Sequence, residues 1–326
     1  VWIMAFTDID KPSDYFNTKL YTGTGSSLAN TGVGFQPDLT WIKGRSGATE
    51  HVLTDSVRGV TKELSSNDTG AEETVAQGLT AFGSDGFTVG TDGSYNTSSA
   101  TYVSWNWKIE SGIFDIQTWT GNGSNRTIAH NLGVAPEFYL VKEIVGSAND
   151  WTVYYGDPTD FLILNESNAT SDAATRWNDT APTASVFSLG TATGGNRNGS
   201  TYIGYFFASK QGVSKIGSYV GNGNADGTFV YTGFKPAFFI LKRTDSAAGW
   251  YMIDNKRGNN FNVIDKYLQP STGASEQTTT FADFVSNGVK LKTSSDDLNV
   301  SGGNFIYIAF AESPFVTSTG IPGTAR

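Results

Sequence analysis

Short runs of apolar residues, separated by Gly, Asn, Ser and Thr, recur along the whole chain. In residues 114–119 apolar and polar positions alternate, which places Phe114 and Ile116 on one face of an extended strand and Asp115 and Gln117 on the other. Similar short strands are predicted at 39–43, 86–90 and 100–108. Many short strands with turn residues between them predict an all-β fold.

Two polar stretches interrupt this pattern. Residues 60–78 are the least strand-like part of the first third of the chain and are compatible with a helical turn. The corresponding stretch, 165–180, is rich in Asn, Asp, Ser and Ala and predicts a surface loop.

One apolar stretch occurs three times. It runs from Gly through Pro into an apolar segment that ends on Lys, and its prolines are Pro37, Pro136 and Pro236. The intervals are 99 and 100 residues, and a Tyr/Trp-x-Gly-x-Gly motif precedes each copy while an aromatic-rich run closes each unit. Four landmarks in one order predict that the chain is an internal triplication.

The repeated stretch has a physical explanation. Proline lacks an N–H, so it suits the start of a strand better than its middle. The apolar segment that follows is predicted to be a strand buried on both faces. Lys43, Lys142 and Lys242 are then expected to close the strand at the rim of the sheet, with their charges in water.

A period of this length favours domains with cores of their own. We predict three tandem, jelly-roll-like β-sandwich domains of about 100 residues each. Their predicted boundaries are 19–110, 111–211 and 212–315. The joints near residues 110 and 211 are short, which implies limited freedom between neighbours. A tail, 316–326, follows the third domain.

Residues 1–18 combine four charged side chains, Asp8, Asp10, Lys11 and Asp14, with scattered apolar ones, without steady periodicity. We interpret this segment as an arm for assembly, in which Phe6, Ile9, Tyr15 and Phe16 would contact another molecule. An edge strand of the first domain explains the same residues equally well.

The composition narrows the classes of function. Only 16% of residues are charged, the net charge is −9 and no basic cluster is present, so a nucleic acid is not expected as a partner. The chain has no Cys, which excludes disulfides and thiolate metal sites. No apolar run is long enough for a transmembrane helix and no signal peptide is recognised, so we expect no membrane partner and synthesis in a cytoplasm.

Catalytic and metal sites find little support. His51 with Asp55 and a nearby serine can be written as a Ser-His-Asp set, but Trp151 and Trp250 occupy the corresponding positions, so His51 is interpreted as a packing or rim residue. His130, in a turn, is expected to be solvated. No cofactor or catalytic residue is predicted, and the carboxylates do not show the spacing of a known calcium loop, although a structural calcium ion stays open.

Two Asp–Arg pairs recur at an interval of 199 residues. They are Asp55 with Arg58 and Asp254 with Arg257, and the second unit has Tyr155 instead. We interpret them as surface pairs that brace a turn. The alternative is a ligand site shared by units one and three.

Aromatic side chains are the other candidates for binding, because sugars stack on the faces of Trp and Tyr. Trp119, Trp151, Trp177 and Trp250 are the candidates, and Trp177 is the best of them because it lies in the polar loop of unit two. Packing in the core is the favoured interpretation for aromatic residues in strands.

The first unit also resembles a known kind of protein. The motifs that carry the resemblance are Tyr-Thr-Gly-Thr-Gly at 21–25, the repeated stretch at 32–43, Asp-Ser-Val-Arg-Gly at 55–59, Leu-Ser-Ser-Asn at 64–67, Asp-Gly-Phe at 85–87 and Tyr-Val-Ser-Trp at 102–105. Together they resemble a module of virion proteins from tailed phages, especially marine ones. The resemblance is strong over unit one and weaker over units two and three.

The resemblance implies a non-enzymatic structural or appendage protein of the virion. A tail fibre, a head fibre or a capsid decoration subunit is expected, in a symmetric homo-oligomer and in contact with other virion proteins. The alternatives are a lectin-like protein that binds host-surface glycans for attachment and, with less support, a polysaccharide depolymerase.

Overall fold

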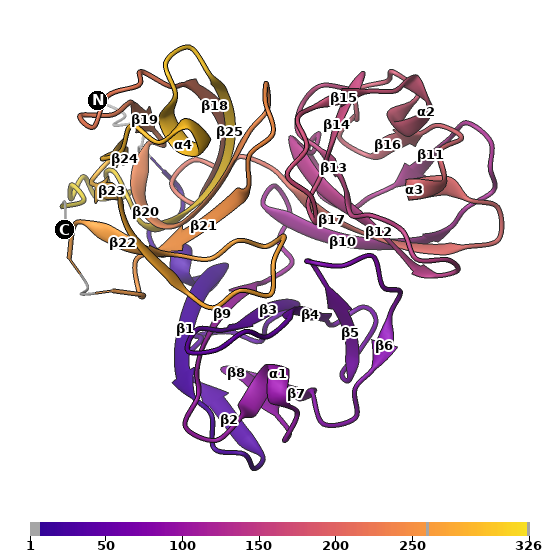
Figure 1. The fold of residues 1–326 in the computed structure, drawn as a ribbon, viewed down its shortest axis with the longest axis horizontal. Helices are drawn as coiled ribbons and strands as arrows, with labels where there is room; N and C mark the ends of the chain where they lie inside the picture. The colour runs from indigo at the N-terminus through magenta and orange to yellow at the C-terminus, as the bar shows by residue number, and fades with distance from the viewer. Residues whose placement is uncertain (1–6, 259–260, 325–326) are drawn as a thin grey trace.

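The computed structural model describes residues 7–258 and 261–324. The chain is all-β, as predicted, and its antiparallel sheets form three lobes around a common centre (Figure 1). Lobe 1 is built from strands β1 to β9, lobe 2 from β10 to β17 and lobe 3 from β18 to β25.

Each lobe pairs two antiparallel sheets, of which the first is the larger in lobes 1 and 2. In lobe 1 the large sheet has the order β1 (Phe16–Thr22), β9 (Thr101–Trp107), β3 (Leu39–Gly44), β4 (His51–Asp55), β5 (Lys62–Ser65) and β6 (Glu73–Thr74). The small sheet has the order β2 (Leu28–Thr31), β8 (Gly86–Val89) and β7 (Leu79–Gly83). A 3-10 turn, η1 (Pro12–Asp14), precedes β1, and a helical turn, α1 (Gly93–Asn96), precedes β9.

Lobe 2 repeats the order of the large sheet. Its strands are β10 (Phe114–Thr120), β17 (Thr201–Phe207), β12 (Phe138–Val145), β13 (Thr152–Tyr154), β14 (Asp160–Ile163) and β15 (Ser171–Asp172). The second sheet pairs β11 (Arg126–Ala129) with β16 (Val186–Leu189). Its helical turns are α2 (Ala174–Trp177) and α3 (Thr193–Asn196).

Lobe 3 has two four-stranded sheets. The first has the order β18 (Ser214–Val220), β25 (Asn304–Pro314), β20 (Phe234–Arg243) and β21 (Trp250–Asp254). The second has the order β19 (Phe229–Tyr231), β24 (Gly288–Leu291), β23 (Gln277–Val285) and β22 (Ile264–Tyr267). A helical turn, α4 (Asp296–Asn299), precedes β25.

The predicted strands are confirmed. The runs at 39–43, 86–90, 100–108 and 114–119 correspond to β3, β8, β9 and β10. The helical turn considered for 60–78 is wrong, because that stretch forms β5 and β6, and the helical turn of lobe 1 lies at α1.

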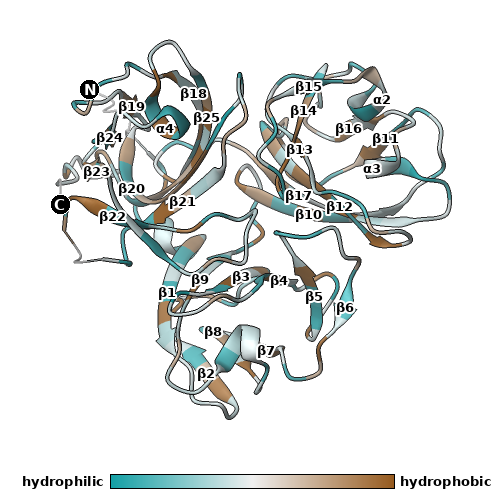
Figure 2. Cartoon of the chain, in the orientation of Figure 1, coloured by the Kyte–Doolittle hydropathy of each residue, from teal (hydrophilic) through white to brown (hydrophobic). Residues whose placement is uncertain are grey.

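The repeated apolar strand is buried on both faces, as predicted. In β12, Phe138 and Leu140 face the centre of the molecule, while Tyr139 and Val141 face the second sheet of lobe 2. Because successive side chains of a strand point to opposite faces, one strand supplies two cores. Hydrophobic stretches accordingly lie within the strands of all three lobes (Figure 2).

A shared core joins the lobes, in addition to the separate core that each lobe has. The ring of Phe310 from lobe 3 lies 4.8 Å from that of Phe16 of lobe 1 and 6.1 Å from that of Phe207 of lobe 2. Such buried rings contribute about 25 cal/mol per Å² of apolar surface removed from water. The three sandwiches are therefore packed on one another rather than strung along the chain.

A buried asparagine explains the Gly-x-Gly motif. In lobe 2, Asn196 accepts a bond of 3.0 Å from the N–H of Asn122 and donates to the carbonyls of Ser124 and Gly190, each at 2.7 Å. Asn96 and Asn299 bond to the corresponding loops of lobes 1 and 3. A Cβ at Gly121 would come within 2.3 Å of a backbone oxygen, so the first Gly of the motif is needed for close approach.

The N-terminal segment packs on its own chain. Ile9 and Tyr15 pack against the shared core, Phe16 is fully buried as the first residue of β1, and Phe6 lies outside the described residues. The hydroxyl of Thr7 donates to the carbonyl of Gln211 at 3.0 Å. The assembly role is therefore wrong for Phe16, whose side chain is inaccessible, whereas Tyr15 stays partly exposed. The alternative, an edge strand of the first lobe, is confirmed from Phe16 onward, where β1 begins.

Candidate functional site

The four candidate tryptophans are buried, and Trp119 has 7% of its surface exposed. Trp177 has 1% of its surface exposed, donates from Nε1 to the carbonyl of Asp160 at 3.0 Å and packs against Tyr139 and Tyr154. Trp151 and Trp250 are equally inaccessible. The interpretation of these rings as an exposed platform for sugars is wrong, and core packing is confirmed.

Trp151 and Trp250 join neighbouring lobes at the contact surfaces that we call seams. Trp151 of lobe 2 donates from Nε1 to the carbonyl of Ser65 in lobe 1 at 2.8 Å. Trp250 of lobe 3 donates to the carbonyl of Ile163 in lobe 2 at 2.9 Å. An indole in this position donates a hydrogen bond to the carbonyl at the end of a strand, and its ring also buries a large apolar surface.

His51 is a packing residue, as predicted. It is fully buried, its ring is stacked on that of Trp105, and its Nδ1 accepts a bond of 3.1 Å from Nε1 of Trp41. Burial lowers the pKa of His51 well below its ordinary value, so the ring is neutral. His130 is also buried, with Nε2 3.0 Å from the carbonyl of Thr183, so the expectation that it is solvated is wrong.

The two Asp–Arg pairs brace turns, but they are buried rather than at the surface. Asp55 accepts from the backbone N–H groups of Val57 and Arg58 at 3.1 and 2.9 Å, and Nε of Arg58 lies 2.5 Å from Asp55 Oδ2. Asp254 accepts in the same way from Lys256 and Arg257. The interpretation as surface pairs is wrong because a neighbouring lobe covers each turn.

The neighbouring lobe also bonds to each carboxylate. The hydroxyl of Tyr205 in lobe 2 donates to Asp55 Oδ2 at 2.8 Å, and Nε1 of Trp105 in lobe 1 donates to Asp254 Oδ2 at 3.1 Å. Each corner therefore closes a seam, the first between lobes 1 and 2 and the second between lobes 1 and 3. Both oxygens of Asp55 and of Asp254 therefore accept hydrogen bonds from the chain itself.

The seam between lobes 2 and 3 is built differently. Tyr155 takes the place of the aspartate and its hydroxyl bonds to Thr170 Oγ1 at 2.8 Å and to Asp160 Oδ2 at 3.1 Å. The position of lobe 3 that corresponds to Trp105 and Tyr205 is Ile308, which has no polar group to offer. Both bonds of the Tyr155 hydroxyl lie within lobe 2, so this tyrosine does not join the two lobes as the Asp–Arg corners do.

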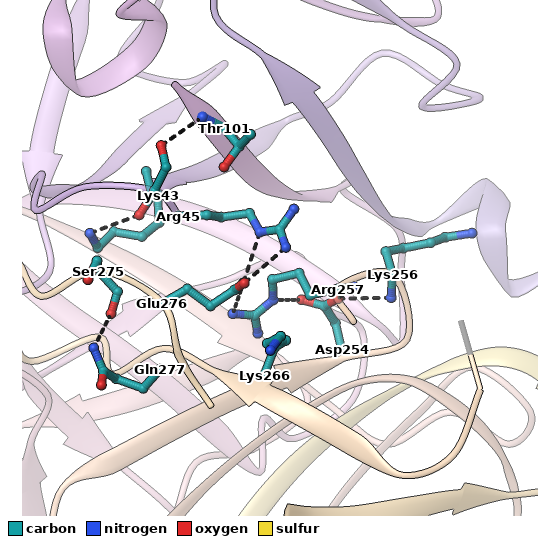
Figure 3. Close-up of polar contacts among 12 residues, drawn as sticks. Lys43, Arg45, Thr101, Asp254, Lys256, Arg257, Lys266, Ser275, Glu276 and Gln277 are labelled. Carbon is teal, nitrogen blue, oxygen red and sulfur yellow. Dashed lines mark hydrogen bonds and ion pairs between the residues drawn. The ribbon is translucent and has the colours of Figure 1, made fainter. Parts of the chain in front are cut away.

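A chain of charges extends the corner of lobe 3 into lobe 1 (Figure 3). Arg45 of lobe 1 makes a two-pronged ion pair with Glu276, with both N–O distances 2.9 Å. Glu276 in turn lies 3.4 Å from Nη1 of Arg257, which pairs with Asp254. The sequence carries no signal for the Arg45–Glu276 pair, because the partners are 231 residues apart and the position of Arg45 is occupied by Ile144 and Thr244 in the other lobes. Glu276 itself has a counterpart in lobe 1, Glu72, which lies 3.5 Å from Nη1 of Arg58.

The lysines that end the repeated strands are buried, which corrects their placement at the rim. Lys43 donates to the carbonyl of Gly273 in lobe 3 at 3.2 Å, and Lys242 donates to that of Ser167 in lobe 2 at 3.3 Å. Lys142 donates to the carbonyl of Asn149. Burial lowers the pKa of each ammonium group to about 8.

Backbone hydrogen bonds tie the seams in a cyclic pattern, in which each lobe bonds to the other two. One set runs from Thr49 N to Gly273 O (3.1 Å), from Asn149 N to Thr69 O (3.0 Å) and from Ala248 N to Ser167 O (2.8 Å). The second set runs from Glu276 N to Arg45 O (3.0 Å), from Glu72 N to Ile144 O (3.2 Å) and from Thr170 N to Thr244 O (2.9 Å).

An open hollow of about 390 Å³ lies between loops of lobes 2 and 3 and is lined by polar residues and one acidic residue: Asn165, Glu166, Ser167, Asn168, Ser271 and Thr272. Within residues 7–258 and 261–324, no three His, Asp or Glu side chains gather so that they could hold a metal ion. No helix among the described residues is long and apolar enough to cross a membrane.

The fold and the seams define a protein of three interlocked β-sandwich lobes. Residues 11–314 match the family described as "Domain of unknown function (DUF7483)", and the chain belongs to this family. The match covers all three lobes. No curated protein matches the chain.

Proposed function

We propose that this protein is a non-enzymatic structural component of a virion: a tail fibre, a head fibre or a capsid decoration subunit. The observation that supports a structural role is the interlocking of the lobes. Each lobe bonds to the other two through backbone groups, and two seams contain buried Asp–Arg pairs with bonds from the facing lobe.

Interlocking of this kind gives a rigid block. Opening one seam would expose apolar surface of the shared core and would break the hydrogen bond from Tyr205 to Asp55 or from Trp105 to Asp254. A subunit of a particle needs this resistance to shape change, because its contacts with neighbours are repeated by symmetry. The assignment to a tailed-phage particle rests on the motifs of lobe 1 described above.

The burial of the candidate tryptophans and aspartates argues against the two alternative functions, glycan binding and polysaccharide depolymerisation. Trp151, Trp177 and Trp250 offer no exposed ring on which a sugar could stack, so the glycan-binding alternative loses the residues on which it was based. A depolymerase would need two carboxylates facing each other across an open groove. Asp55 and Asp254 are instead held in closed corners of different seams.

The test is to locate the protein on a particle. Particles purified from the phage or host strain that encodes this sequence are labelled with an antibody to lobe 3 and viewed by electron microscopy, while mass spectrometry measures the copy number. We expect regularly spaced label on the particle and many copies of the chain. Absence of the chain from particles, with its presence in the soluble lysate, would overturn the proposal.

A further inference from the structure

Lobe 3 carries an exposed apolar patch at neighbouring edges of its two sheets. Val220 ends β18, and Phe229 and Tyr231 flank the buried Val230 in β19; the three side chains are 56, 44 and 55% exposed. Both strands are at an edge of their sheet. The hydroxyl of Thr228 donates to the carbonyl of Val220 at 2.9 Å, which holds the two edges together. We call these three residues the lobe 3 edge patch.

The other lobes provide an internal comparison, because the strand pairing shows which residues correspond. The positions of Val220, Phe229 and Tyr231 are occupied in lobe 1 by Thr22, Ala29 and Thr31 and in lobe 2 by Thr120, Thr127 and Ala129. Small and hydroxylated residues are what a water-facing edge requires. Of the three lobes, lobe 3 alone has large apolar side chains at all three positions. Lobes 1 and 2 form the same strands without them, so the fold does not require these side chains.

A hollow adjoins the patch. It is about 290 Å³ and is lined by Tyr231, Thr232, Lys215, Ser214 and Gln211. An aromatic side chain fits a hollow of this size, so the patch combines protruding rings with a place to receive one. This combination suits a contact in which the same surface meets itself across a two-fold axis.

The distribution of charge also favours a contact between two copies of this chain through lobe 3. Residues 1–110 have seven basic and thirteen acidic side chains, and residues 111–211 have five and nine. Residues 212–326 have ten and nine, so lobe 3 is close to neutral while lobes 1 and 2 carry the net negative charge. Two copies that meet through lobe 3 keep their acidic lobes apart, whereas contacts through lobe 1 or 2 would bring like charges together.

We propose that the lobe 3 edge patch is the docking surface for a second copy of this chain, with β19 of one copy beside β19 of the other. The choice of a second copy as occupant rests on the proposed role as an assembling protein. Self-association in solution and location on a particle are separate measurements, so either proposal can fail while the other stands.

The test is sedimentation velocity of the full chain over a range of concentrations. We expect the wild-type chain to dimerise. The triple variant Val220→Thr, Phe229→Ala and Tyr231→Thr, which installs residues of lobe 1, is expected to weaken the dimer by about tenfold or more. The control Val145→Thr changes an equally exposed valine of lobe 2 and should leave the dimer unchanged. A monomeric wild-type chain, or a triple variant that dimerises as tightly, would overturn the proposal.

A second measurement does not depend on the folding of the triple variant. The chain has no Cys, so a single cysteine reports only its own contacts. Under mild oxidation, Tyr231→Cys is expected to form a disulfide-linked dimer and Val145→Cys to stay monomeric. Equal cross-linking of the two variants would show random collision and would contradict a specific contact.

Discussion

Nε1 of Trp105 in lobe 1 donates a hydrogen bond of 3.1 Å to Oδ2 of Asp254 in lobe 3, and the guanidinium of Arg257 lies over the same indole ring at 5.4 Å. One aromatic side chain therefore contacts both members of a buried ion pair in another lobe. The relationship shows how charge and packing are combined at a seam.

Trp105→Phe should lower the free energy of unfolding because Asp254 then loses a donor while it stays buried. The expected loss from the hydrogen bond is about 1–3 kcal/mol beyond the effect of ring size. Trp107→Phe, two residues along β9, controls for ring size, because Nε1 of Trp107 is buried with no hydrogen-bond partner among the described residues. Urea denaturation measures both, and equal losses would contradict the role of the Trp105–Asp254 bond.

Arg257→Met should be more damaging, because it leaves the carboxylate of Asp254 buried without its counter-ion. The expected cost is about 3–5 kcal/mol. Removing the exposed partner of the Lys11–Asp14 pair, by Lys11→Met, should cost about 1 kcal/mol or less. Chemical unfolding compares the two variants, and similar costs would show that the corner at Asp254 contributes no more than a surface pair.

Stability should rise with pH above about 8 because of Lys43, Lys142 and Lys242, the buried lysines that end the repeated strands. Their pKa is about 8 in the folded chain, against 10.5 for an unperturbed lysine. Between these values the unfolded chain binds more protons, so the free energy of unfolding increases with pH. Below the folded pKa each lysine instead remains protonated in both states, and its burial is a constant cost.

The variant Lys142→Met should reduce this rise. Urea unfolding between about pH 7.5 and 9.5 is the suitable window, because burial raises the pKa of tyrosines such as Tyr205 and Tyr139 above 10 and these oppose the trend at higher pH. Lys11→Met controls for the loss of a positive charge. A slope in Lys142→Met equal to that of the wild type would show that Lys142 does not change its protonation on unfolding.

Asn196→Asp tests the asparagine that organises the Gly-x-Gly loop. The substitution replaces an amide that donates to two carbonyls, at 2.7 Å each, with a carboxylate oxygen that repels them. We expect a loss of at least about 3 kcal/mol, measured by thermal or urea unfolding. Asn198→Asp, at an exposed position two residues away, makes the same chemical change and should be nearly neutral.

The buried asparagine of each lobe could have been predicted from the sequence, although we did not predict it. Asn96, Asn196 and Asn299 each stand six residues before the aromatic residue that begins the closing run, at Tyr102, Tyr202 and Phe305. The recurrence of a polar residue at one place in each unit is a signal of the same kind as the recurrent prolines. Its role could be read only with the Gly-x-Gly loop beside it, more than 70 residues away.

The sequence by itself determined the all-β class, the position of several strands and their burial on both faces, because alternation and turn residues act over a few positions. Only the tertiary structure decided that Lys142, Asp55 and Trp177 are inside. Their burial depends on surfaces brought from far along the chain, as when Tyr205 reaches Asp55 across 150 residues. A local pattern describes the residue and its neighbours, whereas exposure depends on which distant segments pack over it, from its own lobe for Trp177 and from another lobe for Asp55.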